Sequence, residues 1–574
     1  MKSNEDSRIL KDYLDAFKNP DESFLFYYAL EEDRTVAGSH FSRGEFLTLA
    51  RKAAWVLRQH GCQPGDCFSL CVGVNHPYDL AFRLASVMTA TIPVTINWQA
   101  DSLERILYKI ETTQSRLIIT ETHFDPDQLS AIQKQVPHIP LFAIAHLDDQ
   151  QELDDRQFAS GLDSESARIV VFTSGTTGQP KGVQLPYRAY RTNRSTFDRF
   201  LEVGPRDKFG VLIVNPMHHS NSSAITDWAL RRPGSHIHLI QQYSTLYWKI
   251  LADVAAGNYH RLVAPTVSRH FDFLDTLEVQ NRLPVELSTL KTAMGKTDFL
   301  IGSAPVGPTT IRRLQHYAGR IPNVRFGATE TCLQAIGIPK YLSEEAKLKA
   351  FEKGWQYRLN GEALPGYYIG RPHPPYTEAR IVGSITPGQE KYMQDCEPGQ
   401  PGYLITRGQN VMSGYVNNPE ETRAAFDEGW YTGMKDICFA LENENDGELD
   451  YYWVSRESTL LIRGGANYAY DQINAELKQF ISNHYDLPAE SFDVAIVGLR
   501  IDSEHEDSCC VTIEPKTVEA ENRIPQIEET FQNAAKDGVS KGARPDYVRI
   551  GKIPRNFKGA ILVNELADAF KRNQ

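Results

Sequence analysis

The sequence predicts an α/β protein with a large N-terminal domain built from βαβ units and a small α+β domain at its C-terminal end. The length of 574 residues exceeds what one ordinary core covers, which favours two packed units. Helical and strand patterns alternate from about residue 40, and beyond residue 400 the strands become shorter and turns more frequent. We therefore expect an N-terminal domain over 1–456, which includes a small β-barrel-like part, and a C-terminal domain over 457–574.

The first part of the chain carries the βαβ pattern. The segment GEFLTLARKAAWVLRQHG (44–61) places its large apolar residues on one helical face, and CFSLCVGV (67–74) has the continuous apolar character of a buried strand. The next expected elements are a helix over 79–90, a strand over 91–97, a helix from Ser102 and a strand over 115–120. Strands separated by helices in this way form a largely parallel sheet that is covered on both faces.

Shorter strands and a hinge candidate characterise the later part. We expect strands at GYLITRG (402–408) and ELDYYWV (448–454), followed by a polar hinge at Ser455–Thr459. The expected elements of the C-terminal domain are a helix from Tyr470, strands over 493–499 and 509–515, a helix near 525–536 and a strand over 547–551.

The amino-acid composition favours a soluble globular protein over a nucleic-acid-binding or membrane-spanning one. The 41% hydrophobic and 23% charged content is that of a soluble globular protein. The 73 acidic residues exceed the 61 basic ones, which argues against a nucleic-acid partner but not against a small anion such as ATP. The charged N-terminal segment and the lack of any run of ~20 apolar residues predict a cytoplasmic protein without a membrane span. The eight cysteines follow no zinc spacing and are expected to be reduced thiols.

The most informative segment is TSGTTGQPKG (173–182), which runs on from the apolar strand IVVFT (169–173). Glycines let the backbone approach a ligand closely, and successive N–H groups and hydroxyls surround phosphate oxygens while Lys181 adds positive charge. It is not a Walker A loop, because Lys181 follows Pro180 and precedes Gly182. A flexible surface loop is the alternative. The predicted phosphate-binding residues are Thr173, Ser174, Gly175, Thr176, Thr177, Gly178 and Lys181.

This segment closely resembles the phosphate-binding signature of the adenylate-forming superfamily, which comprises acyl- and aryl-CoA synthetases, nonribosomal peptide synthetase adenylation domains and beetle luciferases. The resemblance extends from about residue 40 to 562, because further segments match in the expected order. It implies that ATP, Mg²⁺ and coenzyme A are used. It also implies that the C-terminal domain is mobile and rotates about Ser455–Thr459 between two half-reactions.

The resemblance assigns roles to three further segments. Pro216–His219 resembles the element that lines the acyl side, with His219 at its functional position, although such a histidine is by itself more often structural. Gly302–Pro305 resembles the turn against adenine and substrate, and 326–330 (FGATE) the element in which Thr329 contacts the α-phosphate and Glu330 holds Mg²⁺. The other cofactor-binding residues implied here are Gly302, Ala304, Pro305, Phe326, Gly327 and Ala328.

Residues beyond 400 complete the implied site. GYLITRG (402–408) and Met412–Tyr415 resemble the strand pair before the ribose site. By resemblance, Arg456 contacts the ribose hydroxyls, and Gly464 and Gly465 line the pantetheine tunnel.

Three positions depart from the family pattern. Met434 stands where a ribose-binding Asp is usual, and we expect Asp436 to reach that place by a two-residue insertion. Thr459 occupies the usual hinge position. Ala560 replaces the lysine that bridges the substrate carboxylate and the α-phosphate, and Lys558 is the candidate catalytic cation.

The expected function is ATP-dependent activation of a small carboxylic acid to acyl-AMP with pyrophosphate release, followed by thioester formation with coenzyme A. The alternatives are an adenylating enzyme that loads a separate carrier protein, a nucleotide- or acyl-binding protein that lost catalysis with the lysine at Ala560, and a luciferase-like oxygenase. The polar or small residues His219, Ser220, Asn221 and Ala328 are expected near the acid, whose identity the sequence leaves open.

Overall fold

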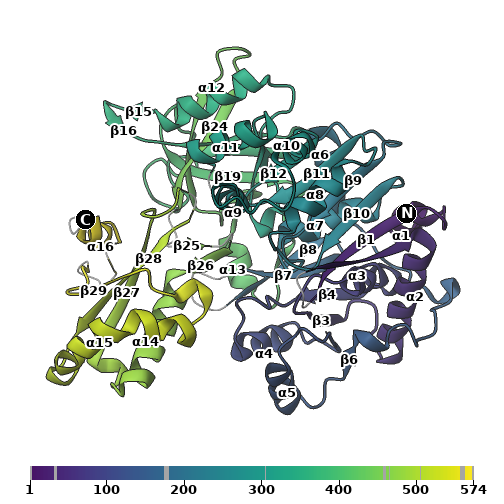
Figure 1. The fold of residues 1–574 in the computed structure, drawn as a ribbon, viewed down its shortest axis with the longest axis horizontal. Coiled ribbons are helices and arrows are strands. Elements are labelled where there is room, and N and C mark those ends of the chain that lie inside the picture. The colour runs from purple at the N-terminus through teal and green to yellow at the C-terminus, as the bar shows by residue number, and fades with distance from the viewer. Residues whose placement is uncertain are drawn as a thin grey trace. The chain divides into compact units, whose positions relative to one another are not determined.

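The computed structural model describes residues 3–31, 35–173, 180–303, 306–456, 460–463, 466–504, 506–555, 561 and 563–571 (Figure 1). The chain divides into two compact units. Unit 1 comprises 1–173, 181–302 and 310–455, and unit 2 comprises 174–180, 303–309 and 456–574. No helix among the described residues is both long and apolar enough to cross a membrane.

The βαβ pattern predicted for the first part is confirmed. Helix α2 (Arg43–Gln59) begins with a capping box, in which Ser42 Oγ accepts from the Glu45 N–H and the Glu45 carboxylate accepts from the Ser42 N–H. The next elements are β3 (Cys67–Cys71), α3 (Pro77–Thr89), β4 (Ile92–Thr95), α4 (Leu103–Thr112), β5 (Ile118–Thr120), α5 (Pro126–Gln135), β6 (Leu141–Ala143) and β7 (Ala167–Thr173). Strands β3 to β7 pair in parallel, as the alternation of helices and strands predicts.

Antiparallel strands complete this first sheet on one side. Strand β8 (Lys181–Pro186) pairs with β7, and β20 (Gly414–Tyr415) pairs with β8. The strand order is β20-β8-β7-β4-β3-β5-β6. A segment from beyond residue 400 therefore lies beside the strand that follows the glycine-rich loop.

A second sheet has a parallel centre. Its parallel strands are β1 (Ser23–Leu30), β9 (Phe209–Ile213), β10 (Ser235–Ile240), β11 (Arg261–Thr266), β12 (Thr297–Ile301) and β13 (Asn323–Phe326). They are arranged in the order β1-β10-β9-β11-β12-β13, with β2 (Val36–Ser42) antiparallel at the edge. The pairs Thr266↔Ile301 and Ile301↔Val324 bring the carboxyl ends of β11, β12 and β13 to one edge, where ligands bind in such sheets.

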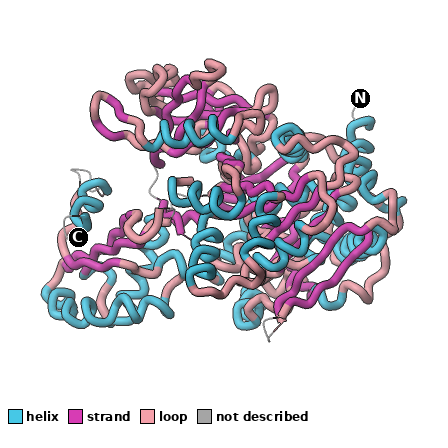
Figure 2. The backbone as a smooth tube through the Cα atoms, turned by 45° about the horizontal axis from the view of Figure 1, so that its top comes forward, coloured by secondary structure: helices cyan, strands magenta, loops and turns pink. Residues whose placement is uncertain are grey.

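Helices pack against these strands (Figures 1 and 2). They are α1 (Ser3–Leu14), α6 (Tyr187–Phe200), α7 (Ser220–Leu230), α8 (Tyr247–Ala255), α9 (Ser268–Val279), α10 (Leu287–Gly295), α11 (Pro308–Ala318) and α12 (Glu344–Trp355). The core that they enclose contains fully buried aromatic side chains such as Phe46, Trp228 and Trp248. A buried ionic network lies within it, because the Asp227 carboxylate accepts from Tyr13 Oη at 2.9 Å and pairs with Arg168 at 3.1 Å and Arg231 at 3.3 Å.

The barrel-like part is a continuation of the second sheet through short antiparallel strands. They are β14 (Ile336–Gly337), β17 (Tyr367–Pro372), β18 (Thr377–Val382), β19 (Gly402–Gly408), β21 (Phe426–Asp427), β22 (Trp430–Tyr431), β23 (Asp436–Glu442) and β24 (Leu449–Arg456). A hairpin of β15 (Arg358–Leu359) and β16 (Glu362–Ala363) and the helix α13 (Pro419–Ala424) accompany them. The strands predicted at 402–408 and 448–454 are thus present.

Unit 2 has the predicted α+β composition. Its C-terminal part contains the hairpin β25 (Leu460–Arg463) and β26 (Ala466–Ala469), and a sheet in the order β27-β28-β29. The remaining elements are α14 (Tyr470–Tyr485), β27 (Phe492–Leu499), β28 (Ser508–Pro515), α15 (Val518–Gly538), β29 (Tyr547–Ile550) and α16 (Val563–Lys571). The long part of this unit begins at Arg456, one residue before the expected domain start.

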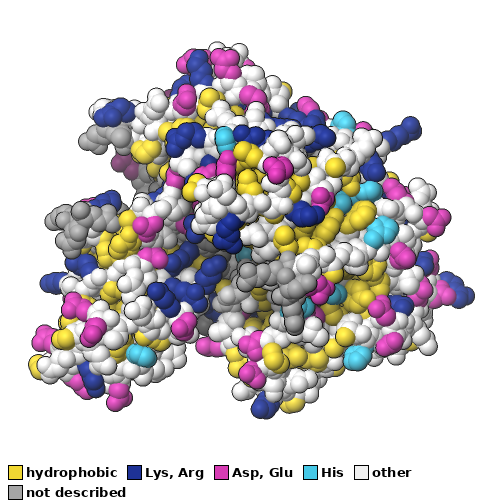
Figure 3. Space-filling model, viewed as in Figure 1, with side chains coloured by type: hydrophobic (Ala, Val, Ile, Leu, Met, Phe, Trp, Pro, Cys, Tyr) yellow, Lys and Arg dark blue, Asp and Glu magenta, His cyan; other side chains and the backbone are white. Residues whose placement is uncertain are grey.

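On the face seen in Figure 3, side chains of Lys and Arg are interspersed with those of Asp and Glu. The cysteines are free thiols, and most of them are buried. Burial raises the pKa of the Cys71 thiol to about 12, so this thiol stays protonated at neutral pH.

Candidate active site of an adenylate-forming enzyme

The two ends of the glycine-rich loop are fixed by strand pairing. Thr173 at the end of β7 pairs with Lys181 at the start of β8. Residues 174–179 lie outside the described part of the chain, and they include the predicted Ser174, Gly175, Thr176, Thr177 and Gly178. The Lys181 ammonium forms an ion pair with Glu421 on α13 and lies 5.4 Å from the ring centroid of Tyr415.

Tyr415 connects this lysine to the predicted magnesium ligand. Its hydroxyl donates a hydrogen bond of 3.0 Å to Oε1 of Glu330, and the Met412 N–H donates to the Glu330 carbonyl at 2.7 Å. Burial, followed by the Glu330 charge, raises the pKa of Tyr415, so the phenol remains a donor. The structure thus brings Lys181 and Glu330 to the same tyrosine, and we call Lys181, Tyr415 and Glu330 the phosphate-side cluster.

The backbone of the FGATE element is tightly folded. Strand β13 ends at Phe326, and a short 3₁₀ helix (Thr329–Thr331) follows. A Cβ on Gly327 would lie 2.4 Å from the Leu333 carbonyl oxygen, so only glycine fits there. The Ala328 N–H donates to Thr331 Oγ1 at 2.9 Å. This turn places Thr329 and the 9% exposed Glu330 directly beyond the carboxyl end of β13.

Mg²⁺ is compatible with the phosphate-side cluster. Magnesium in nucleotide sites is bound by one or two carboxylates, with phosphates and water supplying the other ligands. Glu330 would supply one such carboxylate, which the Tyr415 hydroxyl orients. No group of three or more His, Cys, Asp or Glu residues that could form a metal site by itself occurs among the described residues.

The residues predicted for the acyl side lie near the carboxyl ends of the parallel strands of the second sheet. His219 is the N-cap residue of α7, and its ring centroid lies 4.3 Å from that of His218. Burial and the nearby Lys109 ammonium lower the pKa of His219 to about 4, so its imidazole is neutral at pH 7. Gly302 follows β12, and a Cβ there would lie 3.0 Å from the Arg325 carbonyl oxygen. The predicted Ala304 and Pro305 lie outside the described residues.

A buried ion pair beside His219 could not be deduced from the sequence. Lys109 on α4 pairs with Asp101, and both side chains are almost inaccessible. The Lys109 ammonium also lies 5.1 Å from the ring centroid of Phe172, just before the glycine-rich loop. In sequence Lys109 is one charge on an amphipathic helix, which gives no signal of its burial.

The residues predicted for the ribose and pantetheine sites are placed less completely. Asp436 begins β23 with a fully buried carboxylate, which accepts from Trp453 Nε1 at 2.9 Å. Met434 is buried as well. Arg456 ends β24. Gly464, Gly465 and Lys558 lie outside the described part of the chain.

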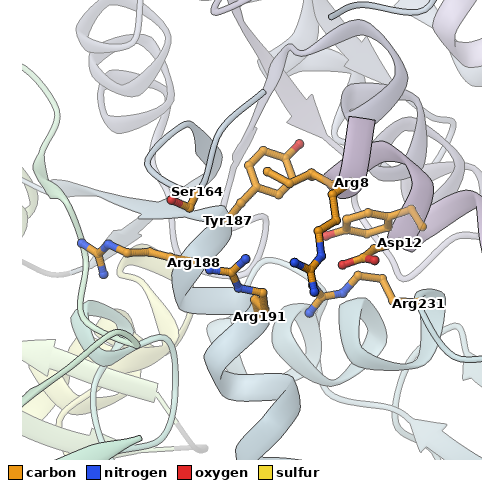
Figure 4. A pocket seen from close by; sticks show the side chains of 9 residues that line it. Arg8, Asp12, Ser164, Tyr187, Arg188, Arg191 and Arg231 are labelled. Carbon is orange, nitrogen blue, oxygen red and sulfur yellow. The ribbon is translucent and has the colours of Figure 1, made fainter. Parts of the chain in front are cut away.

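Unit 1 also contains a pocket that none of the predicted site residues lines. Figure 4 shows the guanidinium groups of Arg8, Arg191 and Arg231 turned toward it beside Asp12, whereas Arg188 points away. Arg188 instead donates to the Val411 carbonyl at 2.6 Å. The residues that line the pocket are Arg8, Ile9, Asp12, Tyr13, Ser164, Tyr187, Arg188, Arg191 and Arg231. None of them belongs to the predicted site.

The fold and the site together are those of an adenylate-forming enzyme. The features are two large sheets, a glycine-rich loop between β7 and β8, and the phosphate-side cluster of Lys181, Tyr415 and Glu330. The chain belongs to the family of AMP-binding enzymes, whose pattern it matches over residues 15–416. It is similar to 2-succinylbenzoate–CoA ligase of Bacillus subtilis, with 23% identity over 556 residues and 96% of each chain covered.

Solved structures show the same fold. The o-succinylbenzoate CoA synthetase of Bacillus subtilis superposes with a TM-score of 0.73 at 20% identity, covering 97% of each chain. The amide bond synthetase McbA of Marinactinospora thermotolerans gives a TM-score of 0.72 at 17% identity, covering 98% of this chain and 99% of its own. The chain is an acid–thiol ligase of the AMP-forming type, which activates a carboxylic acid as acyl-AMP and transfers the acyl group to coenzyme A.

Proposed function

We propose that this ligase acts on a small carboxylic acid with MgATP, with Lys181 binding the β- and γ-phosphates and Glu330 holding Mg²⁺. The observation that carries the assignment is the phosphate-side cluster, since Lys181 and Glu330 both contact Tyr415. These residues are far apart in sequence and have opposite charges. Because Lys181 and Glu330 lie against the same tyrosine, a cation for phosphate oxygens and a hard oxygen ligand for the metal are close together.

In the first half-reaction the substrate carboxylate attacks the α-phosphorus and pyrophosphate leaves. Positioning and charge stabilisation account for most of the rate enhancement in reactions of this kind. Magnesium, when bound, offsets the negative charge of the phosphates. Lys181 exchanges Glu421 for phosphate oxygens, Tyr415 holds the Glu330 carboxylate in place, and Thr329 contacts the α-phosphate.

In the second half-reaction a thiol attacks the acyl-adenylate and AMP leaves. The cation needed in the first half-reaction, between the substrate carboxylate and the α-phosphate, comes from Lys558, because Ala560 stands where the family has a lysine. Asp436 and Arg456 contact the ribose, and Gly464 and Gly465 line the thiol path. His219, which is neutral at pH 7, forms part of the acyl wall without adding charge to it.

The test is pyrophosphate release from MgATP with a panel of carboxylic acids, with and without coenzyme A. The panel contains fatty, aromatic and short polar acids, and 2-succinylbenzoate because a relative is named for it. We expect release that depends on one class of acid and an acyl-CoA product when the thiol is present. An acyl-AMP that accumulates with coenzyme A present would instead favour a carrier protein or an amine as acceptor. Tight ATP binding without any release would contradict the proposal.

A further inference from the structure

Arg325 on β13 is a buried cation, and no carboxylate among the described residues forms an ion pair with it. Its side chain is 5% exposed. The Nη2 group donates to Asn221 Oδ1 at 3.3 Å, and the guanidinium lies 5.2 Å from the ring centroid of Phe197. Nε and Nη1 are buried and have no hydrogen-bond partner among the described residues.

The guanidinium is nevertheless charged at neutral pH. Burial lowers the pKa of Arg325 to about 9, and no carboxylate among the described residues offsets that effect. Nearby His373 is neutral at pH 7, because burial and the nearby arginines lower the pKa of its imidazole to about 4, so it does not balance the charge of Arg325. A buried charge without a partner is costly, and such groups are retained where a ligand completes them.

Arg168, in the same unit, is a buried arginine whose guanidinium has both a carboxylate partner and hydrogen-bond acceptors. It is 2% exposed, pairs with Asp227 at 3.1 Å, and donates to Ser86 Oγ at 2.9 Å and to the Arg83 carbonyl at 3.0 Å. Arg325 is similarly buried, at 5% exposed, but no carboxylate in the described part of the chain pairs with it. The comparison with Arg168 identifies Arg325 as a side chain whose free N–H groups suit an anionic ligand.

The position of Arg325 indicates where that anion belongs. Arg325 directly precedes Phe326 of the FGATE element, and its own carbonyl faces Gly302. Its partner Asn221 lies in the first turn of α7, two residues after His219. The guanidinium therefore points to the acyl side rather than to Glu330, which Tyr415 already engages.

From these contacts we infer that the substrate is an acid with a second anionic group, a carboxylate or sulfonate at its far end, which Arg325 binds. The inference rests on the proposed function, because it assigns the acyl side of the same site. A carboxylate would supply the hydrogen bonds that Nε and Nη1 lack. Arg325 is then the residue that selects the substrate.

The experiment compares matched pairs of acids, such as hexanoate with adipate and valerate with glutarate, in ATP–pyrophosphate exchange. We expect the wild-type protein to prefer the di-acid of each pair by at least about tenfold in kcat/KM, because a charged hydrogen bond is removed with the second carboxylate. Arg325→Met and Arg325→Gln should lose this preference while ATP affinity is kept. Equal use of both acids by the wild type, a preference that survives in the variants, or an equal loss for all acids would overturn the inference.

Stability provides the matched control. Arg325→Met should not lower the melting temperature of the ligand-free protein, whereas Arg168→Met should lower it by several degrees, since it leaves Asp227 with one partner fewer. A fall with Arg325→Met as large as with Arg168→Met would give Arg325 a structural role and overturn the inference.

A binding assay separates this inference from the proposed reaction. If no acid supports exchange, the proposed function fails, and the melting temperature with millimolar glutarate or adipate still tests the arginine. Stabilisation of the wild type by these di-acids, but not by valerate or hexanoate and not in Arg325→Met, would support an anion site. Equal shifts for mono- and di-acids, or none, would overturn it.

Discussion

The hydroxyl of Tyr415 donates a 3.0 Å hydrogen bond to the carboxylate of Glu330, a residue that is only 9% exposed. Tyr415 comes from a two-residue strand that pairs with β8. The strand after the glycine-rich loop therefore sets the position of Glu330, the proposed magnesium ligand, although 85 residues separate Tyr415 from Glu330.

Replacing Tyr415 by Phe should weaken magnesium use. The change removes one hydrogen bond to a charged group, worth about 1.5–3 kcal/mol, so we expect a loss of roughly 10- to 100-fold in kcat/KM for MgATP. Titration of pyrophosphate release with Mg²⁺ measures it. Tyr451→Phe is the control, since that hydroxyl donates to the Ala379 carbonyl at 3.0 Å, and an equal effect there would contradict the role of Tyr415.

Replacing Lys181 by Met should slow adenylation by about 10²–10³-fold, as removal of a positioned transition-state cation does. Steady-state kinetics with varied ATP measure the loss. Glu421→Gln removes the partner of Lys181 without removing the cation, so it should retain activity. If Glu421→Gln were as inactive as Lys181→Met, the ion pair rather than the phosphate contact would explain the loss.

The substitution of the usual end-motif lysine by Ala560 gives a paired test. Lys558→Ala should reduce pyrophosphate exchange by about 10²–10³-fold and leave thioester formation from synthetic acyl-AMP nearly unchanged, because only the first step needs this cation. Ala560→Lys in that background should restore exchange. Unchanged exchange in Lys558→Ala would show that another group supplies the charge.

Stability should fall steeply in weak acid because of buried histidines. Burial lowers the pKa of His76, His219, His236 and His373 to about 4 and that of His238 and His270 to about 3. The unfolded chain, in which these pKa values return to about 6.5, binds more protons below that pH. Stability is therefore present above pH 6.5 and lost as the pH falls toward 4.

Urea unfolding at pH 7.5, 6.0 and 5.0 measures this loss. His270→Phe should reduce the dependence by up to about one proton, since it removes one of the groups. His138→Phe at an exposed position is the control for the general effect of replacing a histidine by phenylalanine. A free energy of unfolding that stays constant from pH 7.5 to 5.0 would contradict the prediction.

The sequence was most informative where a pattern is local. The apolar periodicity of 44–61 predicts α2, and the alternation of helices and strands predicts the parallel sheet. The glycine-rich loop is recognisable because its chemistry lies within ten consecutive residues. These features need no knowledge of what packs against them.

Local sequence patterns could not predict the contacts between segments that are distant in the chain. Lys181, Glu330 and Tyr415 meet only after two sheets have formed, and the sequence offers no sign of the hydroxyl that joins them. The burial of Asp436 and the hydrogen bond that its carboxylate accepts from the Trp453 indole follow from the packing of β23, and no pattern in the sequence indicates them. The burial of Arg325 is likewise a property of the packing around β13 and not of its neighbours in sequence.

The ion pair between Lys181 and Glu421 has a consequence for how the nucleotide is received. Glu421 is 38% exposed, so the pair contributes little to stability and is exchanged at low cost. While the ion pair lasts, it restricts the rotation of the four-carbon side chain of Lys181 before ATP binds. In the proposed reaction, Glu421 therefore holds the Lys181 ammonium in position until a phosphate group of ATP replaces the carboxylate.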